Sequence, residues 1–250
     1  MRDARLSART PLAMDPEEFR RLGHDLVDDI AGFLAALPDR PVTRNAGPAD
    51  VRGFLPDGGL PVAGTDAGLL LRDTARLLFD WSTFNAHPRF FGYITAGPAP
   101  IGVLGDLLAS AVNPNCGAWT LSPLATEIEA QTVRWIADLI GCPAGTGGLL
   151  VSGGNVANFT CFLAARTALA GWNVREEGLA SDGGRRLAVY ASAETHTWIQ
   201  KAADLFGLGT DAIRWVPTDD DLRMDVAALR RSIEADVARG VRPMMVVGTA

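Results

Sequence analysis

The 250-residue sequence predicts an α/β fold, in which a parallel sheet carries helices on both faces and follows a separate helical segment. From about residue 149 onward, short apolar runs alternate with stretches of helical periodicity, which is the pattern of parallel strands joined by helices. Before that point, amphipathic helical stripes are separated by a connection rich in proline and glycine. We therefore expect the two parts of the chain to bury their apolar residues in different ways.

The helical segment opens with a strong start signal at Asp15-Pro16, where a capping side chain precedes a proline at the first helical position. Apolar residues follow at helical spacing as far as Leu37, and prolines then end the helix. Residues 38–64 are expected to form an extended connection, and a second helix is predicted over residues 66–84. Two helices joined by an arm do not close a core, so they must pack either on the rest of this chain or on a partner subunit.

A long uncharged span follows this segment. Between Phe90 and Thr126 the only charged residue is Asp106, but prolines and glycines interrupt the span, which excludes a membrane helix. We expect buried, irregular backbone near an interface or a pocket, with a helix over residues 100–111. A further helix is predicted over residues 122–140, with a glycine directly after it as the stop signal.

The second part of the chain alternates strands and helices. About four strands are expected, at residues 149–151, 187–192, 213–217 and 244–249. A helical pattern follows the first strand at once, and later helices are expected over residues 195–206 and 225–239. A sheet of so few strands, whose last strand has no covering helix, leaves an apolar face exposed, so we interpret it as the first part of a larger domain.

Composition excludes several classes of function. A net charge of −6 and a pI near 5.1 argue against a general binder of nucleic acids or anionic membranes. The N-terminus lacks the apolar stretch of a secretory signal, and the three cysteines lack metal-ligand spacing. We therefore expect a cytoplasmic protein with reduced thiols and no metal site.

The turn Ser152-Gly153-Gly154-Asn155 joins an apolar run to a helical pattern. Such a turn exposes backbone N–H groups at a helix N-terminus, where the peptide dipoles favour an anion by about 0.3–1 kcal/mol. Glycines let the backbone approach a phosphate closely, and the amide of Asn155 can cap the turn or donate to the anion. Many such turns carry glycines for steric reasons, so the turn by itself leaves both interpretations open.

His196 follows the expected strand at residues 187–192, at the edge where ligands bind in open α/β sheets. A histidine at that place is a candidate for stacking on a bound ligand or exchanging protons with it. A structural role at the start of the next helix explains it equally well.

Five ordered segments together resemble the pyridoxal-phosphate-dependent decarboxylases of aromatic amino acids, histidine and glutamate. The segments are HPRFFGYI (87–94), SPLATEIE (122–129), LLVSGGNVAN (149–158), LAAR (163–166) and VYASAETHTWIQKA (189–202). The resemblance implies a fold-type-I PLP-dependent transferase-like large domain, incomplete here, with residues 85–250 as its first part. It also implies that residues 1–84 form a helical segment that packs across a homodimer.

The resemblance implies pyridoxal 5'-phosphate (PLP) as the cofactor and a role for each matching residue. Gly153, Gly154 and Asn155 fall where the family holds the cofactor phosphate. His196 falls at the histidine that stacks on the pyridine ring and can serve as a catalytic proton donor.

Tyr93 and Ile94 match the pair of residues that lines the family's substrate pocket, although a core or interface role for Tyr93 stays open. Ile94 replaces the phenylalanine of the aromatic-amino-acid enzymes, and Gly117 stands at a position where those enzymes have a bulky residue. The identity of the substrate therefore does not carry over with the motif.

Two groups that the family's chemistry needs are not matched: the carboxylate that holds the pyridine nitrogen and the lysine that holds the cofactor covalently. The only lysine, Lys201, lies five residues after His196 and outside the family's lysine motif, so we reject it for this role. We expect the 250 residues to be a truncated part of the enzyme and to be inactive by themselves.

The function that the resemblance implies is that of a PLP-dependent carboxy-lyase. It would convert an L-amino acid, with aromatic substrates favoured, to the amine and carbon dioxide. Two alternatives stay open: an aldehyde synthase that also deaminates the substrate oxidatively on the same scaffold, and a short non-catalytic homologue that acts as a binding partner.

Overall fold

A computed structural model describes residues 13–55, 59–179 and 186–249. The chain divides into two compact units, Met1–Asn113 and Pro114–Ala250. The division falls at a helix end, where Asn113 adopts the left-handed conformation (φ 48°) and the following proline cannot continue the helix. The division by role that we predict from the sequence, between residues 84 and 85, stays a prediction.

In its described residues, the first unit contains the three helices predicted from the sequence and two short helical elements that were not. Its elements are α1 (Pro16–Ala36), η2 (Leu37–Asp39), α2 (Pro48–Arg52), α3 (Ala67–Trp81) and α4 (Pro100–Val112). The predicted cap is in place, because the carboxylate of Asp15 accepts the Glu17 N–H at 2.9 Å. Asp66 caps α3 in the same way, by accepting the Leu69 N–H at 2.8 Å. Helix α2 lies inside the predicted extended connection and, at five residues, is too short to show a periodicity.

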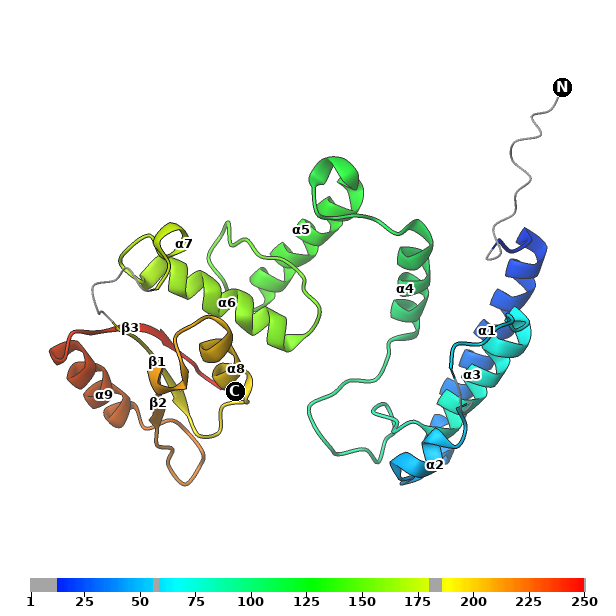
Figure 1. The fold of residues 1–250 in the computed structure, drawn as a ribbon, viewed down its shortest axis with the longest axis horizontal. Coiled ribbons are helices and arrows are strands. Elements are labelled where there is room, and N and C mark those ends of the chain that lie inside the picture. Colours follow the sequence, from blue (N-terminus) through cyan, green and yellow to red (C-terminus); the bar gives the residue numbers. More distant parts are fainter. Residues whose placement is uncertain (1–12, 56–58, 180–185, 250) are drawn as a thin grey trace. The chain divides into compact units, whose positions relative to one another are not determined.

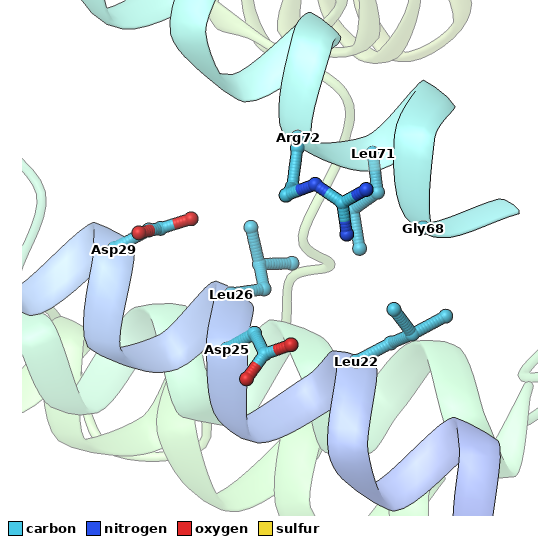
Figure 2. Close-up of a pocket in the computed structure, with 7 residues that line it drawn as sticks. All are labelled: Leu22, Asp25, Leu26, Asp29, Gly68, Leu71 and Arg72. Carbon is cyan, nitrogen blue, oxygen red and sulfur yellow. The ribbon is translucent and has the colours of Figure 1, made fainter.

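Helices α1 and α3 run in the same direction. Leu22 near the start of α1 packs against Gly68 near the start of α3, where a Cβ would lie 3.1 Å from the Leu22 side chain. Near the other end, the rings of Phe33 and Phe79 stack with centroids 4.5 Å apart. Figure 2 shows Leu22 pointing, with Leu71 and other side chains of both helices, into the space between them. The connection between α1 and α3 is long because it carries the chain back to the starting end.

The second unit holds the sheet and its helices (Figure 1). Its elements are η3 (Trp119–Leu121), α5 (Pro123–Leu139), α6 (Gly154–Leu169), α7 (Val174–Glu177), β1 (Arg186–Ser192), α8 (Trp198–Leu205), η4 (Thr210–Ala212), β2 (Ile213–Val216), α9 (Val226–Ala238) and β3 (Val241–Val246). The described strands form a parallel sheet in the order β2-β1-β3, which places β1 in the middle.

The sheet has helices on both faces, as predicted. Val189 of β1 packs with residues of α6 and α8 in one apolar cluster, whereas its neighbour Tyr190 packs with residues of α9 on the other face. Successive side chains of a strand point to opposite faces, so a central strand covered on both sides reads as a continuous apolar run. All residues of β1 after Arg186 are buried.

The prediction of a strand at residues 149–151 is wrong, because these residues form no strand in the structure. The backbone N–H of Leu150 donates to the carboxylate of Glu129 on α5 at 2.7 Å, and the segment pairs with none of the described strands. A three-residue apolar run does not specify its own partner, and here a side chain satisfies its backbone. The sheet therefore has three described strands, where the sequence led us to expect about four.

Strand β3 begins three residues earlier than predicted. It includes Pro243, which pairs with Ala188, and the register shifts immediately afterwards so that Val189 pairs with Met245. Because proline has no N–H to donate to the ladder, an irregularity at this point is its expected consequence.

A buried ionic network joins α9 to the sheet. The fully buried carboxylate of Asp236 accepts the Tyr190 hydroxyl and the Arg214 Nε, both at 2.9 Å, and an Arg239 nitrogen at 2.6 Å. Burial alone would raise the pKa of Asp236, but these hydrogen bonds outweigh it and lower the pKa below its usual value. Burial, and then the hydrogen bond to Asp236, raise the pKa of Tyr190.

The uncharged span is not buried within its unit, contrary to our expectation. Residues 91–100 are all exposed, and Phe91 is 91% exposed. The near absence of charged side chains is consistent with a surface that becomes covered, but it does not identify what covers that surface.

Candidate functional site

The glycine turn forms the start of helix α6. Gly153 is the N-cap residue, with φ 92° and ψ 163°, a conformation that is essentially restricted to glycine. Its carbonyl accepts the first helical hydrogen bond, from Ala157. The N–H groups of Gly154, Asn155 and Val156 meet no acceptor among the residues that the structure describes, and no side chain caps them.

The space in front of this turn is open. A Cβ built on Gly153 or Gly154 would meet nothing within 4 Å, so close packing inside the chain does not explain either glycine. What remains is a turn with free N–H donors at the positive end of a sixteen-residue helix. This arrangement suits a bound anion such as a phosphate.

The direction of α6 places this turn at the carboxyl edge of the sheet. At the other end of the helix, the carbonyl of Leu169 accepts a hydrogen bond from Arg242, the second residue of β3. Since the end of α6 lies beside the start of β3 and the two elements pack together, the helix runs antiparallel to the strand. Its first turn therefore lies toward the edge where the parallel strands end.

His196 belongs to the same edge, four residues after β1 ends at Ser192. Its ring is exposed, and Nδ1 accepts the backbone N–H of Trp198 at 3.2 Å. The neutral ring therefore carries its proton on Nε2. The structural role that the sequence left open is thus present, yet it uses only one of the two ring nitrogens.

A group of hydroxyl side chains beside His196 was not predicted from the sequence. The buried hydroxyl of Thr195 lies 3.5 Å from that of Ser192 and 3.3 Å from that of Thr249, which follows β3. These contacts tie the ends of two strands together next to the histidine. The available signal was that these hydroxyl residues stand at the end of one apolar run, or within a few residues after an apolar run.

The residues predicted to line a substrate pocket belong to the first unit, so the structure describes them apart from the turn and His196. Tyr93 is 93% exposed and Ile94 is fully exposed. Tyr93 also has φ 59°, a left-handed conformation that is costly for a residue other than glycine. Lys201 lies exposed on α8.

A family model, the pyridoxal-dependent decarboxylase conserved domain, matches residues 55–250. The chain belongs to this family. The match covers both the glycine turn and His196 and extends back through Tyr93 and Ile94 into the first unit.

Individual relatives agree with this assignment. The chain is 34% identical to a tyrosine decarboxylase of Oryza sativa subsp. japonica, and this match covers 96% of the present chain. It is 31% identical to an aromatic-L-amino-acid decarboxylase of Bacillus atrophaeus, and this match also covers 96% of the present chain. It is 31% identical to a phenylacetaldehyde synthase of Petunia hybrida over 94%. The chain spans about half the length of these relatives, at 46%, 48% and 47% respectively.

A solved structure extends the agreement to the fold. The crystal structure of Oryza sativa TDC with PLP and tryptamine matches with a TM-score of 0.81 and 29% identity, covering 94% of this chain and 49% of that one. The fold is therefore part of a fold-type-I PLP-dependent domain. Among the described residues, no helix is long and apolar enough to cross a membrane.

The cofactor of the family is pyridoxal 5'-phosphate, and the residues at the carboxyl edge fit it. The free N–H groups of Gly154 and Asn155 suit its phosphate, and the exposed ring of His196 suits a planar aromatic partner. The decarboxylase-family assignment thus agrees with the local chemistry of this edge.

Proposed function

We propose that the protein containing this chain removes the α-carboxylate of an aromatic L-amino acid and releases the amine and carbon dioxide. The observation that carries the proposal is the open glycine turn on the same sheet edge as His196, in a chain of the decarboxylase family. When bound, PLP supplies the electron sink for the electrons released as carbon dioxide leaves.

In this proposal the start of α6 anchors the cofactor. The N–H groups of Gly154 and Asn155 donate to the phosphate, whose charge is also stabilised by the helix dipole. Gly153 supplies the backbone conformation that aims these donors outward. The turn binds and orients, and it takes no part in breaking bonds.

His196 has the second role. Its ring stacks on the cofactor ring, and the Trp198 N–H that occupies Nδ1 fixes the ring orientation. The same bond leaves Nε2 as the proton-bearing atom, which is available to donate during the reaction. We therefore propose His196 as both a cofactor-binding and a catalytic residue.

Tyr93 and Ile94 are proposed to contact the substrate side chain. Their exposure within the first unit and the strained backbone at Tyr93 support this role, since strain of this kind is concentrated at functional sites. The aromatic relatives support an aromatic substrate, and Ile94 adapts the pocket to a differently shaped ring.

The helical segment is proposed to pack across a homodimer. Helices α1, α3 and α4 line an apolar groove that includes Phe19 and Leu70, which are 63% and 57% exposed. Light scattering of the purified full-length protein should give twice the protomer mass, and Leu70→Glu should shift it toward the monomer.

Enzyme assays test the proposal. The full-length protein with PLP should release carbon dioxide and an amine from an aromatic L-amino acid, and His196→Gln should lower kcat by about 10²-fold or more, in line with the loss of a positioned proton donor. The 250-residue chain alone should form no amine, because Lys201 is its only lysine and is exposed on α8. Product formation by the short chain, or by the His196→Gln protein at full rate, would contradict these roles.

A second candidate function is aldehyde synthesis on the same scaffold. The 31% identity to the petunia phenylacetaldehyde synthase, about equal to that of the Bacillus decarboxylase, favours keeping it. Measuring hydrogen peroxide and ammonia beside the amine distinguishes the two reactions. Stoichiometric peroxide and ammonia without amine would replace the decarboxylase proposal by this one.

A further inference from the structure

The loop of residues 86–97 in the first unit is closed at its base. A Cβ built on Gly97 would lie 2.7 Å from the Ala86 Cβ and 3.2 Å from its Cα. Real Cβ atoms do not approach so closely, so only glycine lets the two ends of the loop meet here. The turn at the start of the loop is fixed as well, because the Phe90 N–H donates to the His87 carbonyl at 2.9 Å.

His87 is buried at this base, with 3% of its surface exposed. Its Nδ1 lies 3.0 Å from the Arg89 backbone nitrogen, and its Nε2 lies 2.9 Å from the Arg40 carbonyl oxygen. Because the Arg89 N–H donates to Nδ1, the proton of the neutral ring is on Nε2, which donates to Arg40. One side chain thus joins the loop to a residue 47 positions earlier in the chain.

Arg40 is itself held firmly. Its guanidinium donates to the Phe79 carbonyl at 2.7 Å and to Asp80 at 2.8 Å, and it lies over the rings of Phe33 and Phe84. These contacts fix Arg40 to α1 and to the end of α3. The carbonyl that accepts the His87 hydrogen bond therefore belongs to a rigid platform.

The tip of the loop has no such support within the unit. Phe91, Tyr93 and Ile94 are each more than 90% exposed. Since no described residue of the first unit covers these side chains, the position of the tip depends on how its base is held.

We propose that His87 is a positioning residue, which ties the 86–97 loop to the Arg40 carbonyl and thereby sets where Tyr93 and Ile94 meet the substrate. The inference rests on the substrate-binding role proposed above for these two residues. His87 acts through the loop and has no contact with the reacting atoms.

Two variants separate the two hydrogen bonds of His87. In His87→Gln, the longer side chain places an amide N–H near the position of Nε2 and retains the donor to Arg40. In His87→Asn, the carbonyl oxygen lies near the position of Nδ1 and retains only the local bond to Arg89. Asn85→Ala, an exposed neighbour in the same segment, is the matched control.

The kinetic measurement uses the full-length enzyme saturated with PLP and an aromatic L-amino acid. His87→Asn should raise KM about 3–10-fold, the factor expected for one lost hydrogen bond, with little change in kcat. His87→Gln and Asn85→Ala should stay within about twofold of the parent in KM. Equal KM values for the Asn and Gln variants would overturn the proposal.

Limited trypsin digestion gives a readout that does not depend on activity. Arg89 is exposed within the loop, so cleavage after it reports how often the loop opens. We expect His87→Asn to be cut about 3–10-fold faster than His87→Gln, again by the loss of one hydrogen bond. If His87→Asn is cut faster than His87→Gln in a protein that lacks decarboxylase activity, the proposed function is wrong but the positioning role of His87 is supported. If the active enzyme shows no such difference in cleavage rate, the positioning role of His87 is wrong.

Gly97→Ala keeps the proposal testable if neither His87 variant folds. Its added Cβ must push the loop base apart, so it should raise both KM and the cleavage rate after Arg89. Parent-like values for both quantities would overturn the proposal.

Discussion

The core around β1 and the helical unit bury their apolar residues to very different extents. In the sheet unit, Val189, Tyr190 and Ala191 of β1 and Ile199 of α8 have no exposed surface. In the helical unit, apolar side chains such as Leu70 remain about half exposed or more. A parallel sheet with helices on both faces closes its own core, whereas amphipathic helices present a stripe that something else must cover.

The difference shows that apolar residues can serve two purposes in one chain, either to form a buried core or to form a surface for binding. In the core around β1 they stabilise the chain that carries them, and changes there should appear in unfolding experiments on this chain. Helix α5 of the same unit has an exposed apolar face of its own, with Ile128 and Trp135 more than half exposed. In the helical unit the apolar residues form a surface, so changes there should appear in assembly and substrate binding. The predictions below test this contrast, from the largest expected effect to the smallest.

Breaking the buried ionic network should have the largest effect. Asp236→Ala leaves the buried Tyr190 hydroxyl without its acceptor and Arg214 without its carboxylate, and should lower the free energy of unfolding by about 3–5 kcal/mol. Urea denaturation followed by circular dichroism measures it. Asp221→Ala, which removes an exposed ion pair with Arg223, is the control and should cost less than about 0.5 kcal/mol.

Truncating one apolar side chain in each unit should change the free energy of unfolding by very different amounts. Ile199→Ala removes a fully buried side chain between α8 and the sheet and should cost about 2–5 kcal/mol. Leu70→Ala, on the exposed face of α3, should change the unfolding free energy by no more than about 0.5 kcal/mol. Similar losses for both variants would show that the helical unit closes its core within the single chain.

The stability of the sheet unit should fall at both extremes of pH. Because the folded-state pKa of Asp236 is lowered, its contribution is present above the ordinary aspartate pKa of 3.8 and is lost as pH falls through the folded-state pKa. Because the folded-state pKa of Tyr190 is raised, its contribution is present below the ordinary tyrosine pKa of 10.0 and is lost as pH rises through the folded-state pKa.

Urea midpoints measured across the pH range test this dependence. Tyr190→Phe should remove the decline above pH 10.0 that comes from this group while leaving the acid decline in place. An unchanged alkaline decline in Tyr190→Phe would show that other groups cause it.

The smallest effect should come from the glycine turn. Gly153→Ala forces a Cβ into a conformation that is nearly exclusive to glycine and should cost about 1–3 kcal/mol, together with weaker PLP binding by the full-length protein. Gly154→Ala is the matched control, because Gly154 is helical and a Cβ there meets nothing within 4 Å. Equal losses in the two variants would argue against a special backbone role for Gly153.

Much of the local structure followed from the sequence. The capping carboxylate of Asp15, the stop at Gly141 and the apolar run of β1 predicted elements that the structure contains. These signals act within a few residues of the chain, so they need no knowledge of the fold. The resemblance of five ordered segments likewise indicated the family from the sequence alone.

Pairing and exposure did not follow from the sequence. The run at residues 149–151 has the composition of a strand, but Glu129 of another element satisfies its backbone at Leu150. The uncharged span was expected to be buried and is exposed, because lack of charge does not say which surface covers a segment. The sequence by itself determined where the long helices lie, to within a few residues at their ends, and which residues could bind a phosphate. It also placed His196 and the glycine turn at the carboxyl edge of the sheet, but it placed the turn there through a strand that residues 149–151 do not form. The tertiary structure decided that the turn reaches this edge through the direction of α6, and that His87 ties a loop to Arg40. Those relations depend on strand order and on contacts between residues far apart in the chain, which a local pattern does not encode.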